Sequence, residues 1–557
     1  MSGEDWTSAL AAGLQATHAR LNSPATSWIL WHGCIPCTIL GSLWLLSALR
    51  RYQELRRHLR SGTPITAVIQ DLPKTWPSVA IVTPIRGCRE HSSLNLDSIL
   101  SQEYGGLRHS ACSQTHSRNE FDKVFGGVQL IMNIPPSLHM QAEGEYECIF
   151  VTDSEEDPAV PLLHSLIAAQ KKATGRAARI LFSGQAQKTS QKIHNLLAGI
   201  EAGMGTSDYT LCLDDDVQLP PRLLTWLVRD LASEPGAFMA TGYPFDIPPA
   251  RPSLLSYAVL SYHLPLVIGF SLSRKTSFVW GGCMLFRSPA LRSDSAGLLE
   301  AWRDGGYSDD LITASLCNER GLGVICPPYA VFPQRMPTRC GGAGAWWNYL
   351  RRQLVVLDTY ASPANRRTNA ALAAAHCYWS WALVAPAALL AARAACCGAL
   401  GVQRLATGTA LPIAAPVLPT LAALALAVSW AYAGLGLGAM TARTLSLCEA
   451  LNPRLAPGGL FPVFSWGHVA AGVLLNNAAV PVCMALTFCT SHVTWAGIRY
   501  RRKGGRVVAV EHPAPAPAGG PTRRGGGHGC RPTGRGGREG KRREARGAAQ
   551  QDDCDAR

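Results

Sequence analysis

The stretch Tyr209-Thr210-Leu211-Cys212-Leu213-Asp214-Asp215-Asp216 decides the fold, because a strand-like apolar run ends here in three consecutive carboxylates. Comparable apolar runs lie at 77–84, 146–151 and 178–182. Each ends at a proline or at small and polar residues, which is typical of a buried strand that leads into a turn.

Helix-like segments at 161–174 and 191–202 separate these predicted strands. Such alternation predicts an α/β domain, with a Rossmann-like mixed, mostly parallel sheet and helices on both faces. The polar block 72–360 is long enough for one such domain. Ligands of open α/β sheets bind beyond the carboxyl ends of the strands, where Asp153 and Asp214–Asp216 are expected to lie.

Three acidic clusters are therefore candidates for chemistry: Asp153, Asp214–Asp216 and Asp309-Asp310. Adjacent carboxylates repel one another and persist most easily beside a divalent cation. Asp214 and Asp216 are predicted to hold Mg²⁺ or Mn²⁺ together with the phosphate oxygens of a nucleotide substrate. The third cluster can supply a general base for a hydroxyl acceptor. A solvated acidic turn or a helix N-cap is the simpler alternative for these clusters.

The composition argues for a membrane protein with a sizeable polar part. Only 16% of the 557 residues are charged, and the mean hydropathy is +0.06. The net charge of +14 is concentrated at the end of the chain, where residues 500–557 hold 14 Lys/Arg and 6 Asp/Glu. A basic tail beside apolar segments more often marks the cytosolic side of a membrane than a nucleic-acid site, so no nucleic-acid partner is expected.

An N-terminal transmembrane helix is predicted at 27–49, after a short segment at 1–26. This stretch has no charged residue and is long enough to span about 30 Å of hydrocarbon. Five arginines follow between residues 50 and 60, and the positive-inside rule therefore places the α/β domain in the cytosol.

The C-terminal region 369–498 is predicted to lie in the membrane. It holds two clean apolar spans, 369–392 and 411–440. The third apolar stretch, 460–498, is compatible with a hairpin, a single long span or an interfacial helix. We expect an even number of crossings after residue 368, because basic residues typical of the cytosolic side follow the last apolar stretch.

Two further segments lack the patterns of regular structure. Residues 106–143 have no clear period and are predicted to be an inserted loop. Residues 499–557 are basic and rich in Gly and Arg, and are predicted to be a disordered tail.

Taken in order along the chain, the motifs resemble the ceramide glucosyltransferase family of membrane-anchored, inverting glycosyltransferases with a GT-A fold. The first-strand element Thr83-Pro84-Ile85-Arg86-Gly87 is similar to one family motif, Gln191–Leu196 to a second and Val279–Gly282 to a third. Three separated Asp motifs complete the likeness, which covers roughly 25–100 and 144–503.

The resemblance implies roles for individual residues. Asp310 matches the third Asp, which acts as the catalytic base in this class. His263 and Gly281 fall on the acceptor side. The residues expected to bind the donor are Pro84, Asp153, Lys192 and Asp214.

One family element departs from the pattern. The (Q/R)xxRW motif expected after the third Asp reads Ala343-Gly344-Ala345-Trp346-Trp347, which keeps only the final Trp. Trp347 is assigned to the acceptor side. Arg351 and Arg352 follow one helical turn later and are expected to bind the donor diphosphate, since guanidinium groups suit phosphate geometry.

The resemblance implies transfer of glucose from UDP-glucose to ceramide with inversion, at a Golgi or endoplasmic reticulum membrane and with a cytosolic catalytic domain. Two alternatives remain open. One is another GT-A membrane transferase, such as a polyprenyl-phosphate glycosyltransferase or a polysaccharide synthase. The other is a catalytically degenerate scaffold, for which the altered (Q/R)xxRW element is the main support.

Overall fold

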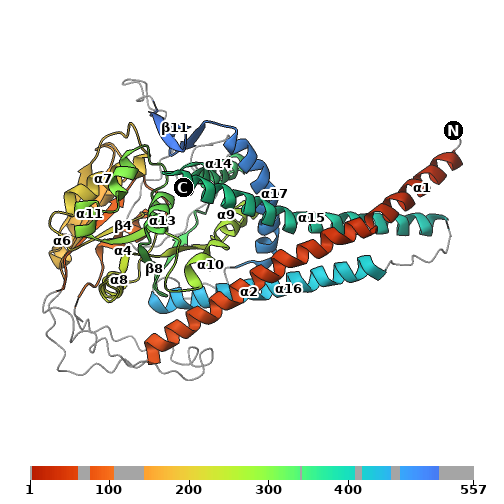
Figure 1. Cartoon of the computed structure of the whole chain (residues 1–557), viewed down its shortest axis with the longest axis horizontal. Helices are drawn as coiled ribbons and strands as arrows, with labels where there is room; N and C mark the ends of the chain where they lie inside the picture. The colour runs from red at the N-terminus through yellow and green to blue at the C-terminus, as the bar shows by residue number, and fades with distance from the viewer. Residues whose placement is uncertain are drawn as a thin grey trace, which may run out of the picture.

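The computed structural model describes residues 3–60, 76–105, 144–338, 341–407, 417–452 and 464–513. The predicted insert 106–143 and the part of the tail after residue 513 lie outside these ranges. The described chain forms an α/β body from which a long helical arm extends (Figure 1).

The body is built on a seven-stranded sheet with the order β3-β2-β1-β4-β7-β5-β8. The first four strands along the chain are parallel, whereas β7 runs antiparallel between β4 and β5. All four strands expected from the sequence are present, and the predicted mixed, Rossmann-like α/β class is confirmed. The strands of this sheet are β1 (Val79–Pro84), β2 (Tyr146–Thr152), β3 (Ala178–Phe182), β4 (Tyr209–Leu213), β5 (Ala237–Thr241), β7 (Cys283–Arg287) and β8 (Gly323–Ile325).

Helices cover both faces of the sheet, because successive side chains of a strand point to opposite sides. In β1, Ile81 belongs to the core under α4, α6 and α8, and Val82 to the core under α7, α12 and α13. The strand ends therefore form a rigid edge on which side chains can be placed. The helices are α4 (Ser92–Leu100), α6 (Val160–Thr174), α7 (Gln191–Gly203), α8 (Leu223–Ala232), α11 (Ser288–Ser293), α12 (Leu298–Arg303) and α13 (Asp309–Arg320).

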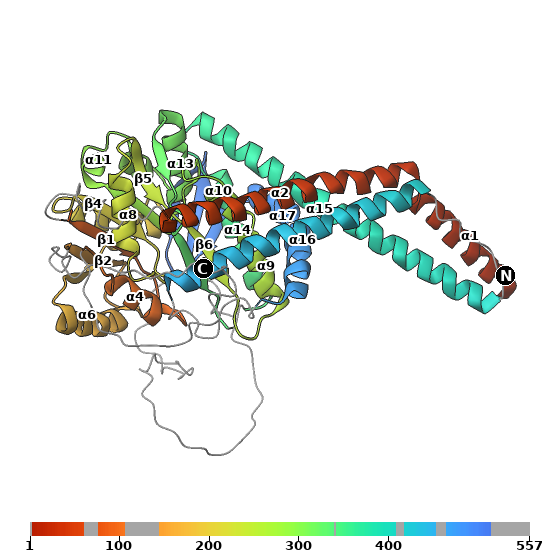
Figure 2. The same ribbon diagram turned by 90° about the horizontal axis from the view of Figure 1, so that it is seen from below.

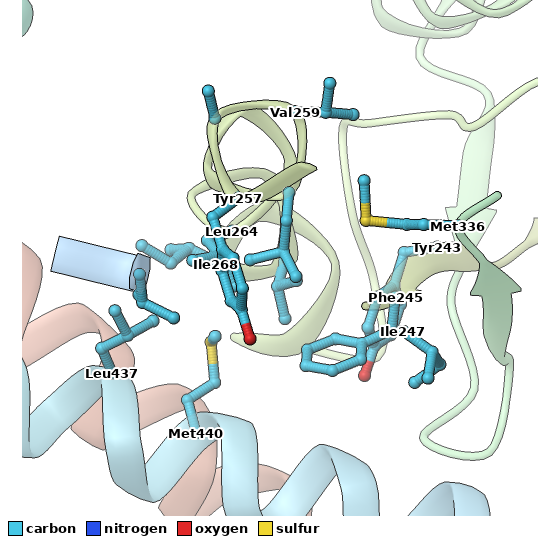
Figure 3. Packing of buried hydrophobic residues seen from close by; sticks show 14 of the residues in the cluster. Tyr243, Phe245, Ile247, Tyr257, Val259, Leu264, Ile268, Met336, Leu437 and Met440 are labelled. Carbon is cyan, nitrogen blue, oxygen red and sulfur yellow. The ribbon is translucent and has the colours of Figure 1, made fainter. Parts of the chain in front are cut away.

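A second layer joins the body to the arm. Its two strands, β6 (Tyr243–Ile247) and β9 (Val331–Arg335), are parallel. β6 is followed along the chain by α9 (Leu254–His263) and α10 (Leu266–Ser271), and β9 is followed by α14 (Ala343–Val355). Side chains of β6, α9 and α10 share one apolar cluster with Leu437 and Met440 of the arm (Figure 3). The body and the arm are therefore packed as one unit.

The arm consists of α2 (Pro24–Arg60), α15 (Pro363–Thr407) and α16 (Val417–Leu451), with α1 (Gly3–Leu21) and the N-terminus at its far end (Figures 1 and 2). α15 leaves the body and α16 returns to it alongside α2. Small residues allow this close approach, since a Cβ on Gly436 would lie 2.5 Å from the carbonyl oxygen of Gly41.

Five helical segments within the described ranges are long and apolar enough to cross a membrane, as expected of a multi-pass membrane protein. Leu254–Ser271 was not anticipated from the sequence. It is broken at Pro265 into α9 and α10, and more than half of it is buried inside the protein. The other four segments are Pro24–Gln53, Pro363–Gln403, Val417–Leu451 and Trp466–Phe488.

The third C-terminal apolar stretch forms one helix, α17 (Trp466–Phe488), and not a hairpin. It contacts α9, α14 and α15 at the base of the arm. The chain then enters a three-stranded antiparallel sheet of β10 (His492–Trp495), β11 (Ile498–Lys503) and β12 (Arg506–Glu511).

This sheet corrects the prediction of a disordered tail from residue 499, which was wrong for residues 499–511. Ile498, Tyr500 and Arg502 alternate as buried residues along β11, and the first two pack in one cluster with Tyr307 and Val355 of the body. The strand is hard to recognise in the sequence because arginine and lysine occupy its exposed face and also one of its buried positions.

Candidate active site

The carboxyl ends of β2, β1 and β4 meet at one edge of the sheet. β1 lies between the other two strands and is parallel to both. Asp153 follows β2, Asp214 follows β4, and the buried Pro84 ends β1 between them. At about 4.8 Å per strand, the neighbouring strands β2 and β4 on either side of β1 are about 10 Å apart at this edge.

Lys192 is the cation at the centre of the second and third acidic clusters. Its Nζ lies 2.8 Å from Asp214 Oδ1 and 3.1 Å from Asp309 Oδ2, and it donates to the carbonyl oxygen of Gly281 at 3.3 Å. The side chain comes from the first turn of α7, which Ser190 caps by accepting from the backbone N–H of Ile193. The helix start therefore fixes the place of the ammonium group.

Burial and mutual repulsion perturb these groups. Burial raises the pKa of Asp214 to about 7, with repulsion from Asp216 and Asp309 adding to the rise and Lys192 opposing it. Burial also raises the pKa of Asp309. For Lys192, burial alone would lower the pKa, but the neighbouring carboxylates of Asp214 and Asp309 outweigh it and raise the pKa. Perturbed pKa values of this kind cluster at functional sites.

The 214–216 cluster divides into one structural carboxylate and two accessible ones. Asp215 is buried and lies 3.0 Å from Arg89 Nη1. Asp216 accepts from Gln334 Nε2 at 2.8 Å and lies 3.3 Å from the same Arg89 atom. The side chains of Asp214 and Asp216 keep 24% and 28% of their surface exposed, so these two are the carboxylates open to a ligand.

The donor set of Asp214 and Asp216 fits Mg²⁺ or Mn²⁺. Both ligands are hard oxygens, and Asp216 raises the pKa of Asp214, so their charges are close enough to repel. Within the described ranges no group of three or more His, Cys, Asp or Glu side chains is assembled to hold a metal. Two protein ligands completed by substrate phosphates and water suit Mg²⁺ in particular.

Asp309 and Asp310 begin α13 and have different surroundings. Asp309 is buried against Lys192 and Gly281, and its backbone carbonyl accepts from Trp302 Nε1 at 3.2 Å. Asp310 is half-buried and accepts from the hydroxyl of Ser308 and, at 2.8 Å, from the N–H of Leu311. Gly281 leaves room for Asp309, because a Cβ there would lie 2.4 Å from Asp309 Oδ2.

Asp153 belongs to a separate ion pair on the other side of Pro84. Its carboxylate accepts from Arg86 Nη1, and Arg86 Nε donates to the carbonyl oxygen of Ala496 at 3.1 Å. Asp157, buried beside this pair, accepts from the backbone N–H of Gly87 at 2.9 Å. The first strand end is therefore tied both to an acidic loop and to the C-terminal sheet.

His263 lies in a polar chain between three elements of the second layer. Its Nδ1 is 2.9 Å from Asp246 Oδ2 of β6, and its Nε2 is 3.1 Å from the hydroxyl of Tyr349 on α14. The neighbouring Tyr262 interacts electrostatically with Asp310. The histidine thus connects β6 to α14 through polar contacts at the base of the membrane helices, near the third acidic cluster.

The two arginines after the altered (Q/R)xxRW element point to different places. Arg351 donates to Thr490 Oγ1 at 3.2 Å and to the carbonyl oxygen of His492 at 3.3 Å. Arg352 is buried, with its guanidinium carbon 5.9 Å from the ring centre of Tyr349 and 5.8 Å from that of Trp495. Trp347 is half-buried against the cluster that joins body and arm.

The structure brings together several residues singled out from the sequence: Lys192 contacts both Asp214 and Gly281 directly. Asp309, the chain neighbour of Asp310, also contacts Lys192. It directs Arg351 toward β10 instead of the carboxylates. Sequence reasoning missed the contributions of Arg89, Asp246 and Gln334. Arg89 carried a signal, as a basic residue just after a strand end that faces an acidic cluster, whereas nothing local marks the other two.

A Rossmann-like sheet with accessible carboxylates at its strand ends, packed against helices long and apolar enough to cross a membrane, fits a membrane-bound glycosyltransferase. Residues 136–436, more than half of the chain, match the model of glycosyl transferase family 21, and the chain belongs to this family. The match confirms the resemblance drawn from the motifs.

Other comparisons are more distant. Among solved structures, a mannosyltransferase from Pyrobaculum calidifontis in complex with GDP-Man and Mn²⁺ is 19% identical, with a TM-score of 0.32. The similarity covers 73% of this chain and 99% of that one. No curated protein matches the chain.

Proposed function

We propose that this family 21 glycosyltransferase transfers glucose from UDP-glucose to the primary hydroxyl of ceramide, with inversion at the anomeric carbon. The observation that carries the proposal is the meeting of Lys192, Asp214 and Asp309 beside elements that pack on the membrane arm. A sugar nucleotide needs charge compensation at its diphosphate, and a ceramide acceptor needs a site at the bilayer surface.

The donor side rests on the strand ends. Pro84 and Asp153 flank the place proposed for the uridine, and Lys192 offers an ammonium group to the diphosphate. Asp214 and Asp216 would hold Mg²⁺ or Mn²⁺, which neutralises charge on the departing diphosphate when bound. Arg352 is buried between Tyr349 and Trp495. We propose that its positive charge also offsets the negative charge of the donor diphosphate.

The reaction is a single displacement. Asp310 takes the proton of the acceptor hydroxyl while that oxygen forms a bond to the anomeric carbon. The bond from this carbon to the diphosphate oxygen breaks, and UDP leaves with the electron pair. Leaving-group stabilisation is needed because transition states at an anomeric carbon resemble oxocarbenium ions.

The acceptor side rests on the second layer. His263 is held by Asp246 and Tyr349. Trp347 packs against the cluster that joins body and arm, and the carbonyl of Gly281 accepts from Lys192. Aromatic side chains of this kind favour the depth of the membrane interface. Ceramide stays in the bilayer, so a site built against the membrane arm suits it as an acceptor.

The test uses purified membranes with radiolabelled UDP-glucose or UDP-galactose and with ceramide, in the presence or absence of a chelator. We expect a monoglucosylated sphingolipid from UDP-glucose and its loss with the chelator. A labelled polymer would identify a polysaccharide synthase. Label on polyprenyl phosphate would identify the other lipid-linked class. Absence of metal-dependent UDP release from any sugar nucleotide would favour a scaffold.

A further inference from the structure

The C-terminal sheet touches the candidate site at two points, one at the β10–β11 turn and one at Tyr500. We propose that the β10–β11 turn and Tyr500 are positioning elements of the donor site. They hold Arg86, with Asp153, and the start of α7, with Lys192, in place for a nucleoside diphosphate. The inference rests on the proposed function, since it assigns a role in binding the same donor.

The first contact is made by the tip of the turn. Ala496 and Gly497 connect β10 to β11 and both have positive φ, 49° and 76°, which is the pattern of a two-residue type I′ hairpin. This backbone directs the carbonyl oxygen of Ala496 to Arg86 Nε at 3.1 Å. Arg86 uses its Nη1 for Asp153, so one guanidinium joins the turn to the first carboxylate.

The second contact is made by Tyr500. Its hydroxyl accepts from the backbone N–H of Gln191 at 3.2 Å. Gln191 is the first residue of α7, where N–H groups have no partner within the helix, and it directly precedes Lys192. The sheet therefore satisfies the helix start that carries the central cation of the site.

Aromatic packing holds the sheet at this place. Tyr307 lies one residue before the cap of α13, and its ring centre is 5.5 Å from that of Tyr500 and 6.2 Å from that of Trp495. Arg352 lies 5.8 Å from the Trp495 ring centre. The sheet thus contacts Arg86, which pairs with Asp153, the start of α7, which carries Lys192, and the segment just before Asp309-Asp310.

The experiment compares two substitutions at one position. Proline cannot adopt a positive φ, so Ala496→Pro breaks the turn, whereas Ala496→Asn preserves it because asparagine tolerates the left-handed region. We expect Ala496→Pro to raise the KM for UDP-glucose and the Kd for UDP about tenfold, with a smaller change in kcat. The Ala496→Asn protein should have the same KM and Kd as the parent.

Two further variants address each contact separately. Arg86→Lys keeps a charge for Asp153 but cannot also reach the turn, and Tyr500→Phe keeps the ring packing but loses the acceptor for Gln191. Both should weaken UDP binding about tenfold without lowering the melting temperature as much as Ala496→Pro. Arg501→Gln is the matched control, because Arg501 is exposed on β11, and it should leave UDP binding unchanged.

The outcomes separate the two proposals. Parent protein that binds UDP but transfers no glucose would overturn the proposed function, while its UDP affinity would still test the role of the sheet. UDP affinities equal to the parent in Arg86→Lys, Tyr500→Phe and folded Ala496→Pro would overturn the role of the sheet. A tenfold loss in Arg501→Gln as well would show a general effect of the sheet on stability, and would also overturn it.

Discussion

At the scale of single residues, Lys192 organises the candidate site. The carboxylates of Asp214 and Asp309 approach one ammonium group from different elements, and the carbonyl of Gly281 accepts from it as well. A cation bound at Asp214 would compete with Lys192 for the same carboxylate. Donor, metal and lysine are therefore expected to act as one coupled set of charges.

The two carboxylates at the start of α13 are expected to differ in role. Asp310→Asn should lower kcat by about 10²–10⁴-fold with the Kd for UDP nearly unchanged, because it removes the proposed base. Asp309→Asn should instead weaken UDP binding, because Asp309 is buried and contacts Lys192. Turnover and UDP binding of both variants are measured side by side. Full turnover in Asp310→Asn would contradict the assignment of the base.

Gly281 offers a steric test of the same place. In Gly281→Ala the new Cβ would lie 2.4 Å from Asp309 Oδ2 and 2.9 Å from its Cγ, so the carboxylate must move. We expect kcat/KM to fall about 100-fold, since displacement of catalytic groups by about 1 Å has effects of this size. Gly344→Ala is the control, because a Cβ at that glycine has no neighbour within 4 Å. Equal activities would show that Asp309 is not constrained as described.

The raised pKa of Asp214 predicts a pH-dependent metal requirement. Burial and the repulsion of Asp216 and Asp309 raise this pKa to about 7, so protons compete with the cation below that pH. One pH unit below the pKa about a tenth of the carboxylate is ionised, and Mn²⁺ activation should be about tenfold weaker than one unit above it. Titrations of UDP release with Mn²⁺ at the two pH values test this. A constant Mn²⁺ requirement would count against Asp214 as a ligand.

At the scale of elements, the strands and helices with strong periodicity could be predicted from sequence. β3 and β4 match their expected bounds, and β1, β2, α6 and α7 differ by one or two residues. The site residues at strand ends followed from this, since parallel strands end at one edge. The different surroundings of Asp309 and Asp310 could not be predicted, because they depend on where α7 and Gly281 lie in space.

The C-terminal sheet shows why composition misled the prediction for residues 499–511. Arg502 of β11 is buried and paired with Asp358, and Val507 of β12 donates its N–H to the carbonyl oxygen of Gly305 at 2.8 Å. A charged residue thus occupies an inward-facing position because its partner comes from a distant segment. The residues next to Arg502 in the sequence give no indication of this pairing with Asp358.

Truncation tests the importance of this sheet. Removal of residues 514–557 should leave activity within about twofold of the parent, because β12 ends at Glu511. Removal of residues 504–557 deletes β12 and takes Val507 out of the apolar cluster that it shares with Tyr307 and Val493. This should lower thermal stability in detergent along with activity. Melting curves and glucose transfer are measured for both proteins. Parental behaviour of the longer truncation would show that β12 is dispensable.

At the scale of the whole molecule, the two ends of the chain are expected on opposite sides of the membrane. α2 runs from the far end of the arm to the body, which places the N-terminus away from the body. Both α15 and the C-terminal sheet contact the body, so we expect the segment between them to cross the membrane an even number of times.

Accessibility of terminal tags tests this arrangement. In sealed vesicles, a tag after residue 557 should be digested together with the α/β domain, and a tag before residue 1 should be protected. Detergent should expose both tags, which controls for the protease. Digestion of both tags in sealed vesicles would contradict the single crossing assigned to α2.

The placement of the C-terminal sheet has a consequence for biosynthesis. A ribosome completes the strands of the α/β body long before it makes β10–β12, and the apolar helices α15, α16 and α17 are made in the interval. A nascent chain therefore has every acidic cluster but lacks the turn that supports Arg86 and the hydroxyl that caps α7. Full affinity for the proposed sugar nucleotide is therefore expected only after α17 has been made and the sheet has folded onto the body.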